Sequence, residues 1–219
     1  MKNKLLILSV FSMLSCSGED LAITDSDGEE SVCGNLIEEP GEECDSDFQC
    51  IYCKYPRMIF INTSKILTID DIGNNSLEYL DDLCESEAIN NGFDTVKTWK
   101  AWISKTDNNI KDRLFQSPGL YVNYVGDIVA YSFEDLIDGS INKPIWYNQL
   151  GVKYDIEVWT GTLTNGSSSF ATCDDWTLID GFGTVGITDS ITASWTSSDE
   201  WANCTDSKYF YCIESEYRL

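Results

Sequence analysis

The sequence predicts an α+β domain over residues 57–219, and three observations support this fold class. Apolar residues recur at helical spacing over residues 77–91 and again over residues 94–103. Short apolar segments typical of strands lie before and after them, separated by long loops rich in Gly, Ser, Thr and Asp. About 160 residues are also enough to bury one sizeable hydrophobic core.

The first predicted helix begins after Asn75, which we expect to cap it. Glu78 follows three residues later, so the pair has the spacing of a capping box. The apolar face of this helix consists of Leu77, Leu80, Cys84 and Ala88. The helix should end near Asn91 and Gly92, because glycine commonly terminates helices.

A second helix is predicted after Asp94, which would cap it. Its apolar positions are Val96, Trp99 and Ile103. Strands are predicted at residues 58–61, 119–122, 128–131, 157–159 and 209–213. We expect these strands to form the sheet of the domain.

The N-terminal segment, residues 1–15, has the composition of an export signal. Lys2 and Lys4 precede an apolar stretch that is too short to remain as a membrane-spanning helix. The next residues, Met13 to Cys16 (Met-Leu-Ser-Cys), resemble the bacterial lipobox, with Met13 in place of the usual leucine. We therefore expect cleavage before Cys16 and lipidation of Cys16. The alternative is an ordinary secretory signal that happens to contain a cysteine.

Lipid on Cys16 would hold the chain in the cell envelope, and we expect it at the outer membrane with the protein exposed on the surface. The residues after this cysteine leave the choice of membrane leaflet open. Residues 17–32 contain six acids and no base, so self-repulsion should keep them extended. We interpret residues 16–32 as a disordered acidic tether between the lipid and the folded protein.

The chain is strongly acidic, and its formal charge of −23 becomes −25 when Lys2 and Lys4 are removed with the signal. Such a charge argues against nucleic acid as a partner and favours basic partners and loosely held cations. The chain also has no histidine, which excludes Ser-His-Asp and Cys-His catalysis and zinc sites with histidine ligands. We predict no catalytic residue, no cofactor and no bound metal.

Nine cysteines divide into Cys16 and eight others, and eight cysteines in an exported chain indicate four disulfides. Four of the eight lie in a short module, residues 33–56, that cannot bury a core and so depends on two disulfides. They are Cys33, Cys44, Cys50 and Cys53, and their pairing stays open. Zinc is the alternative for Cys50 and Cys53. The acids of the module are Glu42, Glu43, Asp45 and Asp47. They could bind calcium, but a solvated acidic loop is the simpler interpretation.

Two parts of the chain resemble known families. Residues 33–45 are similar to the Myxococcus-type cysteine-rich repeat of bacterial surface proteins, through Cys-Gly-Asn and Glu-Pro-Gly-Glu-Glu-Cys-Asp. Motifs of the C-terminal half have the order found in endostatin: Val158-Trp159-Thr160-Gly161-Thr162, Cys173-Asp174-Asp175-Trp176, Cys204 and Tyr211-Cys212-Ile213-Glu214. Residues 58–215 also resemble the leptospiral endostatin-like lipoproteins. Segments shared with them include Trp99-Lys100-Ala101-Trp102-Ile103-Ser104, Lys111-Asp112-Arg113, Gly183-Thr184-Val185-Gly186 and Ser194-Trp195.

This resemblance implies a C-type-lectin-like (endostatin-like) fold with two helices, short and mostly antiparallel strands, and long loops. It also implies the nested disulfides Cys84–Cys212 and Cys173–Cys204, of which the first closes the longer loop and should stabilise more. Sugar-binding lectins of this fold hold calcium through a proline-containing loop, but the loop between Cys173 and Cys204 contains no proline. Its oxygen donors are Asp174, Asp175, Asp189 and Asn203. The histidines and the arginine patch behind endostatin's zinc and heparin binding are missing, so neither activity is expected here.

Tryptophans are the candidate contact residues, and five of them could line a ligand groove: Trp146, Trp159, Trp176, Trp195 and Trp201. Trp159 is expected in the core, whereas Trp195 and Trp201 lie in a loop rich in Ser, Thr and Asp and are the predicted ligand contacts. Arg113 is expected to pair with a buried acid. Asp174 and Asp175 could form an acid–base pair, but adjacent residues of a strand point in opposite directions, so solvated acids are the better interpretation.

Three functions follow from these observations. The first is a non-catalytic surface binding or adhesion protein, for which the resemblance implies host partners such as laminin, fibronectin or complement regulators of the factor H type. The second is an envelope carbohydrate-binding module of lectin type. The third is an enzyme related to the cysteine-dependent oxidases of this scaffold, which would need free thiols. The even number of cysteines left after lipidation argues against the third.

Overall fold

The computed structural model describes residues 22–24, 30–32, 42, 44–45, 54–73, 77–93, 97–117 and 119–217 of the chain. The predicted signal, the predicted lipidation site Cys16, and the expected helix caps Asn75 and Asp94 lie outside the described residues. The same holds for Cys33, Cys50 and Cys53 and for the module acids Glu43 and Asp47. Cys44, the remaining cysteine of the small module, is buried and disulfide-bonded.

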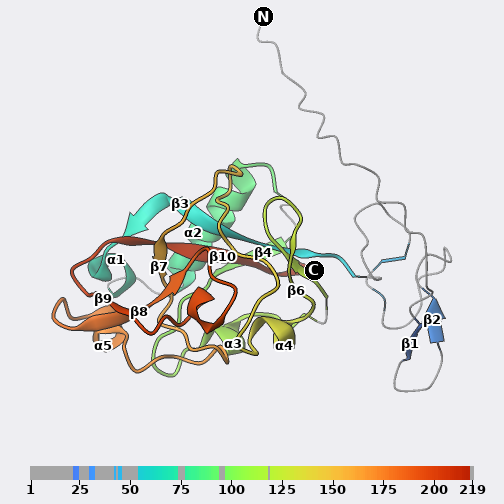
Figure 1. Ribbon diagram of the computed structural model, residues 1–219. Coiled ribbons are helices and arrows are strands. Elements are labelled where there is room, and N and C mark those ends of the chain that lie inside the picture. The colour runs from blue at the N-terminus through green and yellow to red at the C-terminus, as the bar shows by residue number, and fades with distance from the viewer. Residues whose placement is uncertain are drawn as a thin grey trace, which may run out of the picture.

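The described body is a mixed α+β fold built around one sheet, as the sequence predicts at this level (Figure 1). Its eight strands are β3 (Arg57–Leu67), β4 (Lys97–Ala101), β5 (Tyr121–Val122), β6 (Ile128–Ala130), β7 (Glu157–Trp159), β8 (Phe182–Ile187), β9 (Trp201–Asn203) and β10 (Lys208–Tyr217). The order across the sheet is β6-β5-β3-β10-β7-β8-β9, and β4 also pairs with β10. Most pairs are antiparallel, whereas β10–β7 and β3–β5 are parallel.

The described helices are short, apart from α2. They are α1 (Ile69–Gly73), α2 (Leu77–Asn90), α3 (Ile110–Arg113), α4 (Phe133–Leu136), α5 (Cys173–Trp176) and the 3-10 turn η1 (Ala193–Trp195). The first predicted helix is confirmed as α2, and its expected apolar face is buried. Gly92 follows its end with φ +82°, a conformation that glycine adopts without strain. No helix among the described residues has the length and apolar character needed to cross a membrane.

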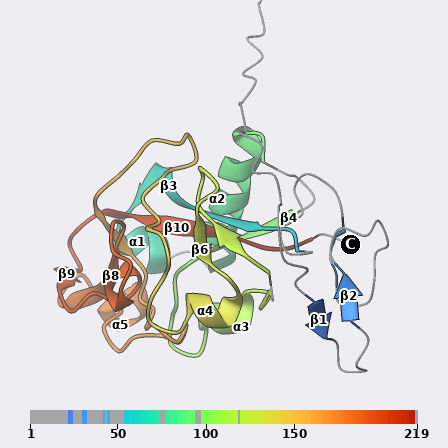
Figure 2. The same cartoon turned by 45° about the vertical axis from the view of Figure 1, so that its right-hand side comes forward.

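Each face of the sheet covers its own hydrophobic core, because the two central strands are apolar on both sides. In β3, Phe60 belongs to one core, whereas its neighbours Ile59 and Ile61 belong to the other. In β10, Phe210 and Tyr211 divide in the same way. Side chains alternate between the two faces of a strand, so this distribution follows from the sequence. Helices α1 and α2 contribute to the first core and α3 and α4 to the second (Figure 2).

A disulfide joins the first helix to the last strand. Cys84 of α2 and Cys212 of β10 are bonded, with their Cα atoms 5.4 Å apart and a sequence separation of 128. This is the pairing that the resemblance implies. In the chain-entropy model a loop of that length corresponds to a stabilisation of about 5 kcal/mol.

The predicted second helix is wrong, because residues 97–101 form strand β4. Cys212 lies opposite Ala101 and Glu214 opposite Trp99 in its antiparallel pairing with β10. Trp99, Ala101 and Ile103 all face the first core, while Trp102 faces the second. This period of two is present in the sequence beside the helical spacing. The hydrogen bonds to β10 select the strand, and they come from a segment more than 100 residues away.

Two three-residue strands lie within the segment for which the sequence predicts a disordered tether. They are β1 (Ala22–Thr24) and β2 (Glu30–Val32), and they pair antiparallel with Ala22 opposite Val32. β-branched residues occur in both strands, which favours this conformation despite the surrounding acids. The other residues of the predicted tether lie outside the described residues.

Candidate binding surface

Three exposed aromatic rings gather beside β8 and β9. These two strands and α5 lie at one end of the body (Figure 1). Phe170, Phe182 and Trp201 are 80%, 52% and 47% exposed. The ring centroids of Phe170 and Trp201 are 5.2 Å apart and those of Phe182 and Trp201 are 6.5 Å apart. We call these three residues the aromatic patch. Large apolar side chains that cluster in solvent commonly mark interaction sites.

The register of β8 and β9 turns Trp201 outward. Trp201 lies opposite Thr184, and Asn203 lies opposite Phe182. Neighbouring residues of a strand point to opposite faces, so Ala202, which is 6% exposed, faces the core. Trp201 and Asn203 on either side of it are exposed. The predicted ligand contact Trp201 is therefore on the surface, as the sequence indicates.

The patch rests on a tightly packed base. A disulfide joins Cys173, the first residue of α5, to Cys204, which follows β9, and this is the second pairing that the resemblance implies. Gly183 lies against this bond, since a Cβ atom there would come 3.0 Å from the Sγ of Cys173 and 2.8 Å from the ring of Trp159. The position therefore requires glycine. Trp159 is fully buried, which confirms its predicted place in the core.

Helix α5 is a left-handed turn. All four of its residues have positive φ: 53° at Cys173, 51° at Asp174, 56° at Asp175 and 66° at Trp176. This conformation costs roughly 1–2 kcal/mol for each residue with a side chain. The fully buried ring of Trp176 offsets part of that cost, and its Nε1 donates a hydrogen bond to the carbonyl of Ser104 (3.0 Å). Strained backbone of this kind tends to occur at functional sites, and here it lies between Phe170 and Phe182 in the chain.

The two acids of this turn have different surroundings. Asp175 accepts a hydrogen bond from the backbone N–H of Thr106 (2.8 Å), and its own N–H donates to the hydroxyl of Thr172. Its carboxylate therefore fixes the turn, while Asp174 is exposed to solvent. Within the described ranges no three Asp, Glu or Cys side chains lie close enough together to hold a metal ion. Asp174, Asp175 and Asp189 therefore do not form such a group.

The chain segment that carries the patch is acidic. Between Lys153 and Lys208 the sequence has no lysine or arginine and nine acids. Three acids flank the patch directly in sequence: Asp199 and Glu200 precede Trp201, and Asp180 precedes Phe182 by two residues. All three are exposed. A surface that combines aromatic rings with this many carboxylates attracts cationic groups, both through Coulomb forces and through the faces of the rings.

Trp195, the other predicted ligand contact, is in the core, so this prediction is wrong. It is 1% exposed, and its ring centroid lies 4.9 Å from that of Trp102 and 6.0 Å from that of Tyr211. The turn η1 folds this polar loop back onto the second core. Trp146 is half-buried beneath Lys153, whose Nζ lies 3.0 Å from the ring centroid.

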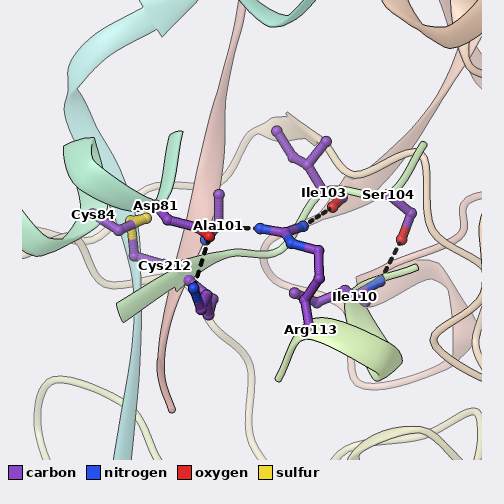
Figure 3. A network of polar contacts seen from close by, with 9 residues as sticks. Asp81, Cys84, Ala101, Ile103, Ser104, Ile110, Arg113 and Cys212 are labelled. Carbon is purple, nitrogen blue, oxygen red and sulfur yellow. Dashed lines mark hydrogen bonds and ion pairs between the residues drawn. A yellow bond between two sulfur atoms is a disulfide. The ribbon is translucent and has the colours of Figure 1, made fainter. Parts of the chain in front are cut away.

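A buried ionic network forms the second concentration of charged groups (Figure 3). Asp81 of α2 accepts hydrogen bonds from a guanidinium nitrogen of Arg113 (2.5 Å), from Nζ of Lys100 (3.0 Å) and from the backbone N–H of Ala101 (2.9 Å). Arg113 also donates to the carbonyl of Ile103 (2.7 Å). The expected pairing of Arg113 with a buried acid is confirmed. Burial lowers the pKa of Arg113 from its usual value, against the attraction of Asp81.

This network is structural. It joins α2, β4 and α3 through the hydrogen bonds of Asp81. The side chains of Asp81 and Arg113 are 8% and 13% exposed, so both partners of the ion pair are largely shielded from water. The three donors to Asp81 use three of the roughly four lone-pair sites of the carboxylate.

Sequence reasoning missed Phe170 and Phe182. A signal was present for Phe170, a single large ring that follows Gly166 and three serines. Phe182 lies among apolar residues that resemble a core strand, so the sequence offered no sign of its exposure. The comparisons add no family: the chain matches no protein-family model, and no curated protein matches it at a significant level.

Proposed function

We propose that this chain is a non-catalytic, lipid-anchored protein of the cell surface that binds other proteins through the aromatic patch. The observation that carries the proposal is the exposure of three contacting aromatic rings on a strained, disulfide-held base. A rigid aromatic cluster binds with little loss of conformational entropy, and tryptophan is enriched among residues that dominate binding energy. Partners of the laminin, fibronectin or factor H type, and a C-type-lectin-like classification of the domain, are parts of this proposal.

The test is a solid-phase binding assay with the full-length protein in detergent micelles. Phe170→Ser and Trp201→Ser should each weaken saturable binding to laminin, fibronectin or factor H. Tyr131→Ser is the matched control, because Tyr131 is 53% exposed and follows β6, at the opposite end of the strand order from β9. Added salt should weaken binding as well. Binding that both patch variants retain, or no saturable binding at all, would exclude the proposal.

A second candidate is a carbohydrate ligand, which the exposed ring of Trp201 favours, because sugar rings stack on tryptophan. Calcium is not needed for stacking. A glycan array separates the candidates: sugar binding that Trp201→Ser abolishes, without protein binding, would support a lectin. Loss of the array signal with EDTA would in addition indicate a calcium site.

A further inference from the structure

We infer that β9 is an open sheet edge that accepts an extended, basic segment of another protein as an additional strand, an inference that rests on the proposed function and adds the binding mode and the partner's chemistry. β9 ends the strand order of the sheet. An edge strand presents unpaired peptide groups, and proteins bind extended segments by pairing with them.

The peptide groups of Trp201 point away from β8. Its partner Thr184 donates its N–H to the carbonyl of Ala171, and its own carbonyl accepts from the N–H groups of Thr160 and Gly161. The N–H and the C=O of Thr184 therefore both form hydrogen bonds on the side of β8 that faces β7. In an antiparallel ladder this makes Thr184 and Trp201 a pair without mutual hydrogen bonds, so the N–H and C=O of Trp201 face the outer edge.

Asn203 follows the same pattern. The N–H of Cys204 donates to the carbonyl of Gly181 (3.1 Å), so residue 204 faces β8 and residue 203 faces outward. The carbonyl of Asn203 accepts from Asp206 (2.9 Å) in the turn that follows. This leaves the N–H and C=O of Trp201 and the N–H of Asn203 without a partner in the described part of the chain. They lie two residues apart on one side, which is the spacing that an added strand requires.

The surroundings of this edge select a basic segment. Asp199 and Glu200 lie directly before the strand. Asp206 closes the turn after it and lies 3.9 Å from Nζ of Lys208, so the two acids before the strand are the main attraction for cations. Acids beside an edge repel a strand of the same charge, and a second copy of this chain carries the same net charge of −23. An extended segment in which Lys or Arg alternates with apolar residues fits both sides: its apolar side chains meet the aromatic patch and its cations meet the carboxylates.

The experiment uses the full-length protein in detergent micelles and a short dye-labelled peptide of alternating Lys and Val. Binding is followed by fluorescence anisotropy at low and at physiological ionic strength. The same peptide, N-methylated at every residue so that neither of its edges can donate hydrogen bonds, should bind about tenfold more weakly, a change of about 1.4 kcal/mol. A Glu–Val peptide should not bind. Amide hydrogen exchange at Trp201 and Asn203 should slow when the Lys–Val peptide is added.

Protein variants give the matching comparison. Asn203→Pro removes the outward N–H without touching a bond to β8 and should weaken peptide binding about tenfold. Asn203→Ala retains that N–H and should change binding by about twofold at most, within the range of a surface substitution. The methylated peptide needs no change in the protein, so its result stands even where the proline variant is unstable.

Each outcome decides between the inferences. Equal binding of the methylated and unmethylated peptides, or no binding of the Lys–Val peptide, overturns strand addition, and so does self-association of the protein through β9. The proposed function survives those results if Phe170→Ser still weakens the capture of a protein partner. The proposed function is refuted independently if the patch variants bind their partners as the wild type does.

Discussion

Replacement of Asp81 by alanine should destabilise the fold by about 3–5 kcal/mol, because it leaves a buried arginine without its counter-ion. The carboxylate accepts hydrogen bonds from Arg113 and from the backbone N–H of Ala101, and it pairs with Lys100. The side chain of Arg113 is 13% exposed, so water replaces the lost partner poorly. The backbone N–H of Ala101, a fully buried residue, would also lose its acceptor, which accounts for about 1–3 kcal/mol of this total.

Urea unfolding of the full-length protein, with its disulfides intact, measures this loss. Asp82→Ala is the matched control, because Asp82 is the next residue of α2 and is exposed. It should change the free energy of unfolding by no more than about 0.5 kcal/mol. The double variant Asp81→Ala/Arg113→Met should recover part of the stability, since it removes both charges. A stabilising role for the network would be refuted if Asp81→Ala lost less than about 1 kcal/mol, or if Asp81→Ala and Asp82→Ala lost equal amounts.

Three further predictions concern stability and binding. A hydrogen bond from Lys65 lowers the pKa of Asp71 from its usual value of 3.8, so Asp71 stabilises the fold above pH 3.8 and this contribution is lost as the pH falls through the lowered pKa. The free energies of unfolding of Asp71→Asn and wild type should differ at neutral pH and converge in acid, and an equal difference at both pH values would contradict the assignment. Gly186→Ala should cost roughly 1–3 kcal/mol or prevent folding, because the new Cβ would collide with the backbone carbonyl at the end of η1; an unchanged melting temperature would rule this out. Replacement of both Cys173 and Cys204 by serine should lower the free energy of unfolding by about 3–4 kcal/mol, because the disulfide closes a loop of sequence separation 31. The same variant should bind partners more weakly through the aromatic patch, and undiminished binding would show that the strained turn holds without the disulfide.

The single sequence predicted those features that depend on local pattern or composition. The helix around Cys84 could be found because its apolar residues repeat every three or four positions and no other spacing fits them. Trp159 could be placed in the core because it lies in an apolar strand. The acidic character of the surface, and with it the preference for basic partners, follows from composition alone.

Tertiary structure decided the remainder, for reasons that distant contacts supply. The spacing of residues 96–103 fits a helix and a strand about equally well, and pairing with β10 selects the strand. Trp195 and Trp201 lie in similar polar loops, yet η1 buries one while the β8–β9 register exposes the other. The sequence of a loop shows the polarity of each side chain but not whether that side chain is exposed. Which of them faces solvent depends on the strand or core against which that loop packs, and this is why the sequence fixes neither the members of the aromatic patch nor the open edge beside it.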